Sequence, residues 1–414
     1  MRKIKCDNLI IGGGPAGLAA AATSHRKTLL IDDNAKLGGQ IWRAHLNKIK
    51  SKPANNLFKQ IDLGVVQTKH SATFAALLTQ NIALIVTRDS SYSVEFETAI
   101  IATGARERFL PFPGWTLPNV FGAGGLQALV KGGLDVKGKR VIVAGTGPLL
   151  LAVGEFLTKS GADVLCIAEQ ASNGSLFTLG INTLTIPSKL FKGFALFLNS
   201  KTKFLTNSYV VRAEGANRLE SVTIYENGNI KTFECDLLAY GFHLVPNTEV
   251  AELFGCQIED GFVSVNDVQE TSVNGIFCAG EPTGIGGLEL SLIEGKIAGI
   301  AADKPNSVSK SLLRQREKFK RFARHLKNGY ELRAELRNLA ERETIVCRCE
   351  DVCFGELSKF SSFRAAKLQT RLGMGACQGK ICGSACEILF GWQKNTARPP
   401  LLPIPACALI EEPK

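Results

Sequence analysis

The 414-residue chain lacks a long apolar run and contains only five histidines. A membrane-spanning helix needs about 18 consecutive apolar residues. The longest candidate, residues 141–154, contains a Gly-Thr-Gly sequence that is typical of a turn. The histidines are scattered singly, so no Cys–His or Ser–His pairing for nucleophilic catalysis is predicted. We therefore expect a cytoplasmic protein without a transmembrane segment and without a catalytic side chain of its own.

Glycine and cysteine are abundant, whereas the hydrophobic and charged fractions are ordinary. The 41 glycines make up about one residue in ten, above the usual ~7%. Without a collagen period, this excess indicates tight turns and close contacts between backbone and phosphate. Seven of the twelve cysteines fall after residue 346. Clustering at one end of a long chain favours a metal site over a disulfide scaffold.

A glycine turn joins a short apolar strand, residues 7–11, to an alanine-rich helix, residues 18–24. In its G-x-G-x-x-G pattern the first glycine permits the turn, the second lets the backbone approach a pyrophosphate, and the third allows close helix–strand packing. The next predicted strand, residues 27–31, ends in two acids, of which Asp33 is preferred over Asp32 for binding a ribose hydroxyl. The residues assigned to this dinucleotide site are Gly12, Gly14, Pro15, Ala16, Gly17 and Asp33.

Three further segments indicate that this dinucleotide is FAD. Gly-Gly-Gln follows the acids closely, Thr-Gly ends a predicted strand at residues 99–102, and Gly-Glu precedes a Gly-Gly pair and a helix late in the chain. A carboxylate there can accept hydrogen bonds from flavin ribityl hydroxyls, and the helix N-terminus can stabilise negative charge on the reduced ring. The residues assigned to the flavin are Gly39, Gln40, Thr103, Gly104, Gly280, Glu281 and Gly287.

A second strand–turn–helix segment contains Gly145 and Gly147, but Leu150 replaces the third glycine. Glu169 ends the next predicted strand. If this site binds a ligand, the carboxylate favours NAD or another adenine nucleotide over NADP, because it repels a 2′-phosphate. The alternative is a fold element without a ligand.

These features resemble the two-dinucleotide flavoproteins of the glutathione and thioredoxin reductase superfamily. The resemblance implies an α/β fold with two Rossmann-like domains. The FAD domain would be split between residues 1–110 and 255–305, with a second nucleotide domain at residues 111–254 inserted between its halves. Those reductases carry a redox cysteine pair beside the flavin. No cysteine follows the Gly-Gly-Gln segment here, so we expect no disulfide reductase activity.

Two cysteine pairs, spaced C-x-C and C-x4-C, lie 27 residues apart near the end of the chain. C-x-C is tighter than the C-x2–4-C spacing usual for structural zinc, whereas a [2Fe–2S] cluster takes two ligands per iron and both spacings can supply them. Backbone N–H groups of residues 371–375 are expected near the sulfurs. A zinc ion and free thiols are the alternatives. Cys353 and Cys386 are expected to pack in the core, with replacement of a ligand as the alternative. The predicted metal ligands are Cys347, Cys349, Cys377 and Cys382.

The cysteine region resembles the [2Fe–2S] domain of bacterioferritin-associated ferredoxin, fused to an N-terminal flavoprotein. The octopine and nopaline oxidases have this arrangement in their A subunits, and hydrogen cyanide synthase has it in its B subunit. Residues 280–281 and 294–299 match the same group, so the resemblance spans nearly the whole chain. It implies a small, mainly helical [2Fe–2S] domain at residues 343–392, preceded by a helical linker at 306–342 and followed by a Pro-rich tail at 393–414.

Residues 309–342 have a helical period and carry seven of the eleven net positive charges. One interpretation is a solvated helix face. A sharper hypothesis is a docking surface for an acidic partner subunit or acceptor. We expect no nucleic-acid partner, because no reader motif accompanies the charge.

The resemblance implies that a partner, a second flavoprotein subunit similar to an amino-acid oxidase, oxidises the substrate. This chain would then pass electrons to an acceptor. We therefore expect an FAD- and [2Fe–2S]-containing subunit of a heteromeric amino-acid or opine dehydrogenase that acts on CH–NH or CH–NH2 donors. The alternatives are a stand-alone NAD(P)H-dependent flavin reductase of an electron carrier and a redox-sensing binding module.

Overall fold

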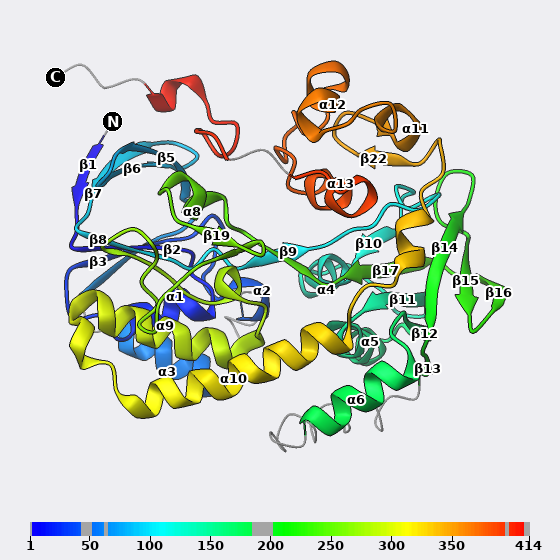
Figure 1. Ribbon diagram of the computed structural model, residues 1–414, viewed down its shortest axis with the longest axis horizontal. Coiled ribbons are helices and arrows are strands. Elements are labelled where there is room, and N and C mark those ends of the chain that lie inside the picture. Colours follow the sequence, from blue (N-terminus) through cyan, green and yellow to red (C-terminus); the bar gives the residue numbers. More distant parts are fainter. Residues whose placement is uncertain (1, 43–51, 62–64, 184–201, 394–396, 410–414) are drawn as a thin grey trace. The chain divides into compact units, whose positions relative to one another are not determined.

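A computed structural model describes residues 2–42, 52–61, 65–183, 202–393 and 397–409 (Figure 1). The chain divides into two compact units, and each unit contains segments that are distant in the sequence. The first unit comprises Met1–Arg106, Pro246–Ala323 and Thr396–Lys414. The second comprises Glu107–Val245 and Arg324–Asn395.

The first unit is built on a five-stranded parallel sheet with the order β21-β8-β2-β3-β4. Its strands are β2 (Asn8–Ile11), β3 (Thr28–Ile31), β4 (Val66–Lys69), β8 (Thr98–Ile101) and β21 (Ile276–Cys278). Successive side chains of a strand point to opposite faces of the sheet. One face, which carries Ile10 and Ile100, packs against α1 (Pro15–Ala21), α3 (Lys52–Ile61) and α9 (Gly287–Asp303).

The opposite face carries Leu9 and Ile101 and packs against a second sheet with the order β1-β7-β6-β5. The strands of this second sheet are β1 (Arg2–Lys5), β5 (Thr73–Thr79), β6 (Ile82–Val86) and β7 (Ser91–Glu95). Apolar side chains therefore alternate between two separate cores along each central strand. The arrangement leaves the carboxyl ends of β2 and β3 at one edge of the sheet, where α1 begins.

The second unit repeats this plan with a parallel sheet in the order β10-β17-β11-β12-β13. Its strands are β10 (Val120–Gly122), β11 (Arg140–Thr146), β12 (Asp163–Glu169), β13 (Lys203–Leu205) and β17 (Leu237–Phe242). Leu150 and neighbouring apolar residues of α4 (Ala123–Lys131) and α5 (Pro148–Lys159) cover one face. An antiparallel sheet of β14 (Ser208–Glu214), β15 (Ser221–Glu226) and β16 (Asn229–Glu234) contributes to the core on the other. Both parallel modules predicted from the sequence are thus confirmed.

The cysteine-rich region is small and mainly helical, as predicted. It contains β22 (Ile345–Cys347), β23 (Val352–Cys353), α11 (Phe354–Leu357), α12 (Phe363–Thr370) and α13 (Cys382–Phe390). These elements enclose an apolar cluster of their own that includes Phe363, Leu372 and Trp392. The remaining short elements are α2 (Gly39–Trp42), β9 (Ala105–Glu107), α6 (Asn173–Thr183), β18 (Leu244–Pro246), α8 (Glu249–Leu253), β19 (Ile258–Glu259), β20 (Phe262–Val263), η2 (Glu281–Thr283), η3 (Pro305–Ser307) and η5 (Ala406–Leu409).

The basic segment is less helical than its period predicts. α10 covers Lys310–Gly329, and only the short 3-10 helix η4 (Ala334–Asn338) follows it. Continuous helix to residue 342 is therefore wrong. Beyond Gly329, the Glu331 carbonyl oxygen and the Arg333 backbone N–H form hydrogen bonds with the side chain of Gln170. In the described ranges, no helix is long and apolar enough to cross a membrane.

Candidate cofactor sites

The first glycine turn lies between β2 and α1 and is closely packed on one side. Gly12 has φ +110°, and a Cβ added there would lie 2.3 Å from the Ala102 carbonyl oxygen. A Cβ at Gly17 would lie 1.8 Å from the Gly12 carbonyl oxygen. At Gly14 the nearest atom is 3.9 Å away, on Gly39. Gly12 and Gly17 are therefore needed for packing, whereas Gly14 leaves room beside the backbone for a ligand.

The two acids after β3 have different roles in the structure. Asp32 is buried, and its Oδ2 accepts a hydrogen bond of 2.6 Å from the Gly13 backbone N–H, within the turn. Its Oδ1 accepts from the backbone and side-chain nitrogens of Asn34. Asp33 is exposed and accepts from Asn34 Nδ2 at 2.6 Å. Asp32 thus lies closest to the turn, while ribose binding by Asp33 stays a prediction.

Two of the other predicted flavin segments lie beside the same turn. Gly39, the first residue of α2, approaches Gly14, since a Cβ at Gly39 would lie 3.0 Å from the Gly14 Cα. The Thr103 hydroxyl donates to the Asn247 carbonyl at 2.7 Å, and Asn247 Nδ2 donates back to the Thr103 carbonyl at 2.9 Å. The Asn247 backbone N–H donates to the Gly104 carbonyl at 3.0 Å. Asn247 therefore fixes a segment that the sequence could identify only by its Thr-Gly pair.

Two glutamates, the half-buried Glu281 and the fully buried Glu294, surround the turn before α9. Glu281 Oε1 accepts a hydrogen bond of 3.0 Å from the Gly287 backbone N–H, and its Oε2 has no partner among the described residues. Glu294 Oε2 accepts from the Gly280 backbone N–H at 2.9 Å and from the Thr283 hydroxyl at 2.8 Å. Burial raises the pKa of each carboxyl to about 7. The Glu281 carboxylate keeps a free acceptor, which suits a ligand that carries hydroxyl donors.

Glu294 had no role assigned from the sequence. It is fully buried on α9, where its charge is stabilised mainly by the two hydrogen bonds within the Gly280–Thr283 turn. The signal that could have identified it is an acidic residue on the apolar face of a predicted helix, because a buried carboxylate needs specific partners.

The second glycine turn holds its acid as the first does. Gly145 has φ +135° and packs against the Gly241 backbone. Glu169 is 1% exposed, and its carboxylate accepts from the Thr146 hydroxyl at 2.7 Å, from Gly147 N–H at 2.8 Å and from Ala171 N–H at 2.8 Å. Burial raises its pKa to about 7. The predicted residues Gly145, Gly147 and Glu169 are thus brought together, and the carboxylate binds its own turn.

The four predicted cysteine ligands line one cavity of about 70 Å³. Cys347 ends β22, Cys382 begins α13, and Cys349 and Cys377 belong to the intervening loops. The sulfur atoms of Cys349 and Cys377 are 3.7 Å apart. The residues that line the cavity are Phe109, Cys347, Arg348, Cys349, Cys377, Ile381 and Cys382. Folding therefore gathers four thiols that are up to 35 residues apart in the sequence.

Hydrogen bonds favour a thiolate at Cys347. A side-chain hydrogen bond from Cys382, together with the backbone N–H groups of Gly373, Glu350 and Cys349, lowers the pKa of Cys347 to about 6. Gly373 lies in the segment expected to present N–H groups to sulfur, and that expectation is confirmed. The contacts pair Cys347 with Cys382 and Cys349 with Cys377, across the two sequence pairs.

The four thiols line one cavity and contact one another in pairs, but no group of three or more His, Cys, Asp or Glu side chains in the described ranges is close enough to hold a metal ion as the structure stands. Binding of a cluster by these thiols therefore stays a prediction.

The two spare cysteines behave differently from each other. Cys386 is fully buried in the local core, as predicted. Cys353 is half-buried and caps α11, where its backbone N–H donates to Glu356 at 3.0 Å. The expectation that Cys353 packs in the core is therefore wrong, because the N-cap position lies at the surface.

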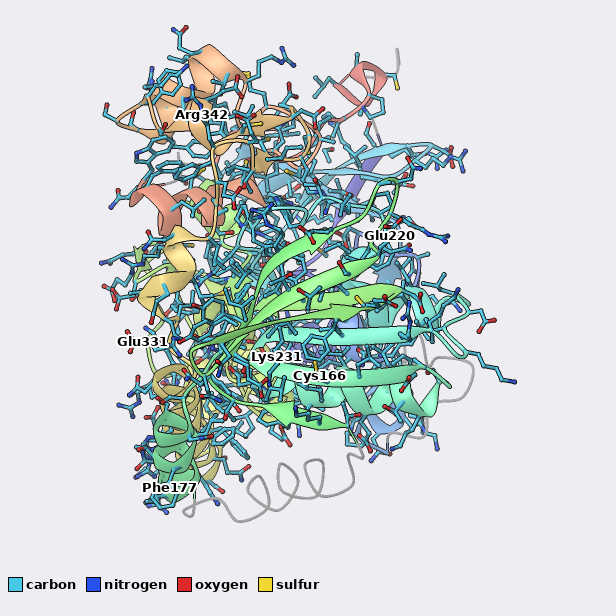
Figure 2. All side chains as sticks on the ribbon, turned by 90° about the vertical axis from the view of Figure 1, so that its right-hand side faces the viewer. Cys166, Phe177, Glu220, Lys231, Glu331 and Arg342 are labelled. Atoms are coloured by element: carbon cyan, nitrogen blue, oxygen red, sulfur yellow. The ribbon has the colours of Figure 1, made fainter. Side chains whose placement is uncertain are left out.

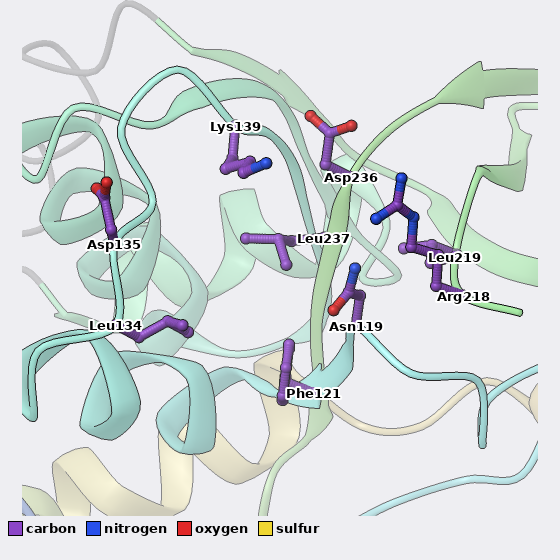
Figure 3. A pocket seen from close by; sticks show the side chains of 9 residues that line it. All are labelled: Asn119, Phe121, Leu134, Asp135, Lys139, Arg218, Leu219, Asp236 and Leu237. Atoms are coloured by element: carbon purple, nitrogen blue, oxygen red, sulfur yellow. The ribbon is translucent and has the colours of Figure 1, made fainter.

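A larger cavity of about 230 Å³ lies at the amino ends of β10, β11 and β17, away from the glycine turn (Figure 3). The sequence had given no indication of it. Its charged residues are Asp135, Lys139, Arg218 and Asp236, of which Asp236 accepts from the Arg140 backbone N–H at 2.8 Å. The lining mixes both signs of charge with leucines, and it singles out no class of ligand.

Two parallel sheets, each with a glycine turn where a strand ends and a helix begins, define a two-dinucleotide oxidoreductase fold. Residues 6–295 match the family model for pyridine nucleotide-disulphide oxidoreductase. The chain belongs to this family. Membership implies an FAD-dependent oxidoreductase, and the first unit fits that cofactor: the open side of Gly14 admits a pyrophosphate, and Glu281 Oε2 offers an acceptor.

Relatives extend the similarity to the whole chain. It is 29% identical to hydrogen cyanide synthase subunit HcnB of Pseudomonas protegens, over 97% of this chain and 96% of that protein. It is also 29% identical to the A subunit of opine oxidase from Rhizobium meliloti, over 96% of this chain and 97% of that protein. The fold of L-proline dehydrogenase from P. horikoshii matches with a TM-score of 0.74 over 99% of this chain and 80% of that chain, at 18% identity. The resemblance to these oxidase and synthase subunits is thus confirmed.

Proposed function

We propose that the chain is the FAD- and [2Fe–2S]-containing subunit of a heteromeric amino-acid or opine dehydrogenase that acts on secondary amines. A partner flavoprotein oxidises the C–N bond, and this chain relays the electrons to an acceptor. The observation that carries the proposal is the gathering of four cysteines around one cavity in a chain of an FAD-dependent family. The names of the relatives, one from an oxidase and one from a synthase, support the subunit role.

We favour a two-iron cluster at these thiols, and the paired sulfur contacts are compatible with it. A single zinc ion takes about four ligands at one centre. A [2Fe–2S] cluster takes two thiolates on each iron, and the sulfurs fall into two contacting pairs. When bound, a flavin accepts two electrons and a [2Fe–2S] cluster carries one at a time. Backbone N–H groups around Cys347 would stabilise the negative charge of such a group.

Residues of the first unit support binding of the flavin rather than disulfide chemistry. Cys6, Cys256 and Cys278 are buried, and burial raises the pKa of each of these thiols. A buried thiol with a raised pKa is a poor nucleophile. Glu281, by contrast, has an acceptor oxygen without a partner among the described residues. The proposed role therefore assigns these cysteines to packing and excludes a disulfide substrate.

The basic side of α10 is the proposed docking surface for the partner subunit. Four basic residues recur at helical spacing on this side and are exposed, and none of them forms an ion pair within the described ranges. They are Lys310, Arg314, Lys318 and Arg321. The opposite side of the helix is held by Arg316, which is 2% exposed. The four cations form what we call the basic stripe, and an acidic face on the partner flavoprotein is its complement.

Arg316 fixes the direction in which the basic stripe faces. Its guanidinium donates to the Asp267 carboxylate at 2.8 Å and to Gln269 Oε1 at 3.3 Å, and it also contacts the Asp267 carbonyl oxygen. A buried arginine with several acceptors resists rotation of the helix, because turning it would leave a buried charge unpaired. The stripe therefore stays exposed.

Anaerobic purification tests the cofactor content. We expect bound FAD with about two iron and two acid-labile sulfide atoms per chain. Protein that holds zinc but neither iron nor sulfide would contradict the electron-relay role.

Reduction experiments separate the candidate functions. In the proposed role, an amine substrate bleaches the flavin absorbance of this chain only when the partner flavoprotein is present. Rapid bleaching by NADH alone would identify the stand-alone reductase. A flavin that neither donor reduces would favour the redox-sensing module.

A further inference from the structure

The carboxyl end of β12 is covered by residues 330–333, which we call the strap. Gln170, which is fully buried, connects the strap to the second glycine turn. Its Nε2 donates to the Thr146 hydroxyl and to the Glu331 carbonyl oxygen, both at 3.0 Å, and its Oε1 accepts from the Arg333 backbone N–H at 3.1 Å. Glu331 lies on the segment that leaves α10 beside the strands of this unit (Figure 2). All three hydrogen-bonding groups of the Gln170 amide are therefore used.

Both ends of the strap are anchored independently of Gln170. The Tyr330 side chain is 8% exposed, its ring lies 6.1 Å from that of His243, and its backbone oxygen accepts a hydrogen bond from the His243 ring. The Arg333 guanidinium lies 5.9 Å from the ring centre of Tyr209 and donates to Glu335 at 2.8 Å. A cation above an aromatic face is stabilised by the ring quadrupole. The strap is thus held along its whole length.

The two glycine turns differ at the residue that follows the acid. In both, the acid accepts from a backbone N–H of its own turn: Asp32 from Gly13, and Glu169 from Gly147. After Asp32, the next residue is exposed. After Glu169, the next residue is Gln170, which the strap covers. In dinucleotide-binding folds the adenosine ribose hydrogen-bonds to the acid that ends the second strand. Here that acid is Glu169, which already accepts from Thr146, Gly147 and Ala171, and the strap lies against the residue next to it.

We infer that the strap takes the place of the adenosine ribose at the second turn, so that this module excludes NAD and NADP. Residues 330–333 and Gln170 are then the determinants of donor specificity in this oxidoreductase, since they deny a nicotinamide dinucleotide its usual anchoring point. The module keeps the fold for packing, and electrons must enter from a donor other than a nicotinamide. The inference extends the proposed function without depending on it, because it concerns binding at the second turn alone.

Binding of nicotinamide dinucleotides to the flavin-loaded protein tests the inference directly. Calorimetric titration of the wild-type chain with NADH and with NADPH is expected to give no saturable binding, with a dissociation constant above about 1 mM. Saturable binding of either nucleotide below that concentration overturns the inference.

Hydrogen exchange tests the strap itself, without any nucleotide. The fragment that contains Arg333 is expected to exchange slowly in the wild type. Gln170→Ala removes the acceptor of the Arg333 N–H and should accelerate its exchange about five-fold. Gln127→Ala, which removes only a glutamine that accepts from Lys131 on α4, is the matched control and should leave the rate unchanged. Rapid exchange in the wild type, or equal rates in both variants, would show that Gln170 does not hold the strap and would overturn its role in excluding the nucleotide.

The two proposals fail in distinguishable ways. Binding of NADH to the wild-type chain would contradict the role proposed for the strap, whether or not a partner subunit reduces the flavin. If NADH does not bind, and if an amine substrate with the partner subunit does not reduce the flavin, the proposed electron relay is contradicted. The role proposed for the strap is then still supported.

Discussion

At the residue scale, the buried carboxylates make the clearest link between structure and pH. Glu281 and Glu294 lie close enough for the negative charge of Glu294 to raise the pKa of Glu281 further, beyond the effect of burial. Both are held near a turn that the resemblance assigns to the flavin. Burial of an ionised carboxylate with few partners costs stability, and protonation relieves that cost.

Glu294→Gln is expected to change how stability depends on pH. The pKa of the Glu294 carboxyl is about 7 in the folded protein, whereas its ordinary value is 4.5. Between these pH values the folded state therefore binds more protons than the unfolded state. Stability should therefore fall as pH rises from 4.5 to 7, by at most about 3 kcal/mol for this group. Glutamine keeps an acceptor for Gly280 and Thr283 and removes the titration, so the variant should lose less stability.

Thermal unfolding across this pH range measures the difference. Glu259→Gln, which neutralises an exposed acid of the same unit, is the control and should follow the wild type. A Glu294→Gln variant with the same pH slope as the wild type would show that the carboxyl titrates normally in the folded protein.

The cysteines give a second residue-scale prediction. Cys349→Ser removes one sulfur of the Cys349–Cys377 pair at an exposed position, so the fold should survive while iron and sulfide are lost. Cys353→Ser is the matched control, because serine is a good N-cap and Cys353 lies outside the cavity. Iron and acid-labile sulfide are measured in both purified variants. Equal cluster content in the two variants would contradict the ligand assignment.

At the element scale, the packing of α9 on α1 depends on two glycines. A Cβ at Gly295 would lie 2.1 Å from the Ala16 carbonyl oxygen, and one at Gly299 would lie 2.4 Å from that of Ala20. Such close contact with backbone leaves no space for a methyl group. The same crossing places Gly280, and with it Glu281, next to Ala16 at the first glycine turn.

Gly295→Ala is expected to destabilise the first unit by about 1–3 kcal/mol, because the two helix backbones must separate. Gly180→Ala is the control, since Gly180 lies inside α6 with no atom within 4 Å of an added Cβ. Alanine has the better helix propensity, so this control should be neutral or stabilising by up to about 1 kcal/mol. Denaturant titration measures the free energy of unfolding of both variants. Equal changes in this free energy would show that the α1–α9 contact is looser than described.

At the scale of the whole molecule, the net charge of +11 is concentrated locally. The basic stripe places four cations side by side on α10, and Arg316 keeps it exposed. Charge gathered in one stripe steers a partner, whereas dispersed charge mainly affects solubility. The location of the charge therefore matters more than its total.

Association with the proposed partner subunit is expected to weaken as salt rises. Arg314→Gln combined with Arg321→Gln should lower the association rate constant about ten-fold at low ionic strength. Lys137→Gln combined with Lys159→Gln removes the same charge from the second unit and should have little effect. Stopped-flow measurements over a range of salt concentrations test this. Association that is indifferent to salt, or equally slowed in both double variants, would exclude docking through the stripe.

Much of the site could be predicted from the sequence because its signals are local. A strand, a glycine turn and a helix are adjacent in the chain, so spacing alone identifies Gly12, Gly14 and Gly17. The same holds for the C-x-C and C-x4-C cysteine pairs. Backbone geometry within a few residues determines these features, since only glycine fits where a Cβ would meet a carbonyl oxygen.

The tertiary structure decided what distant segments do to one another. The helical period of the basic segment predicted helix to residue 342, but α10 ends at Gly329, and the backbone beyond it hydrogen-bonds with Gln170, 161 residues from Glu331. Burial likewise brought Asp32 to the first turn and left Asp33 exposed. Hydrogen bonds between residues far apart in the chain have no local signature, because many sequences can supply a glutamine or a carbonyl oxygen. The sequence alone therefore predicted which groups could approach a phosphate or a cluster, and only folding determined that the strap hydrogen-bonds to Gln170 beside the second turn.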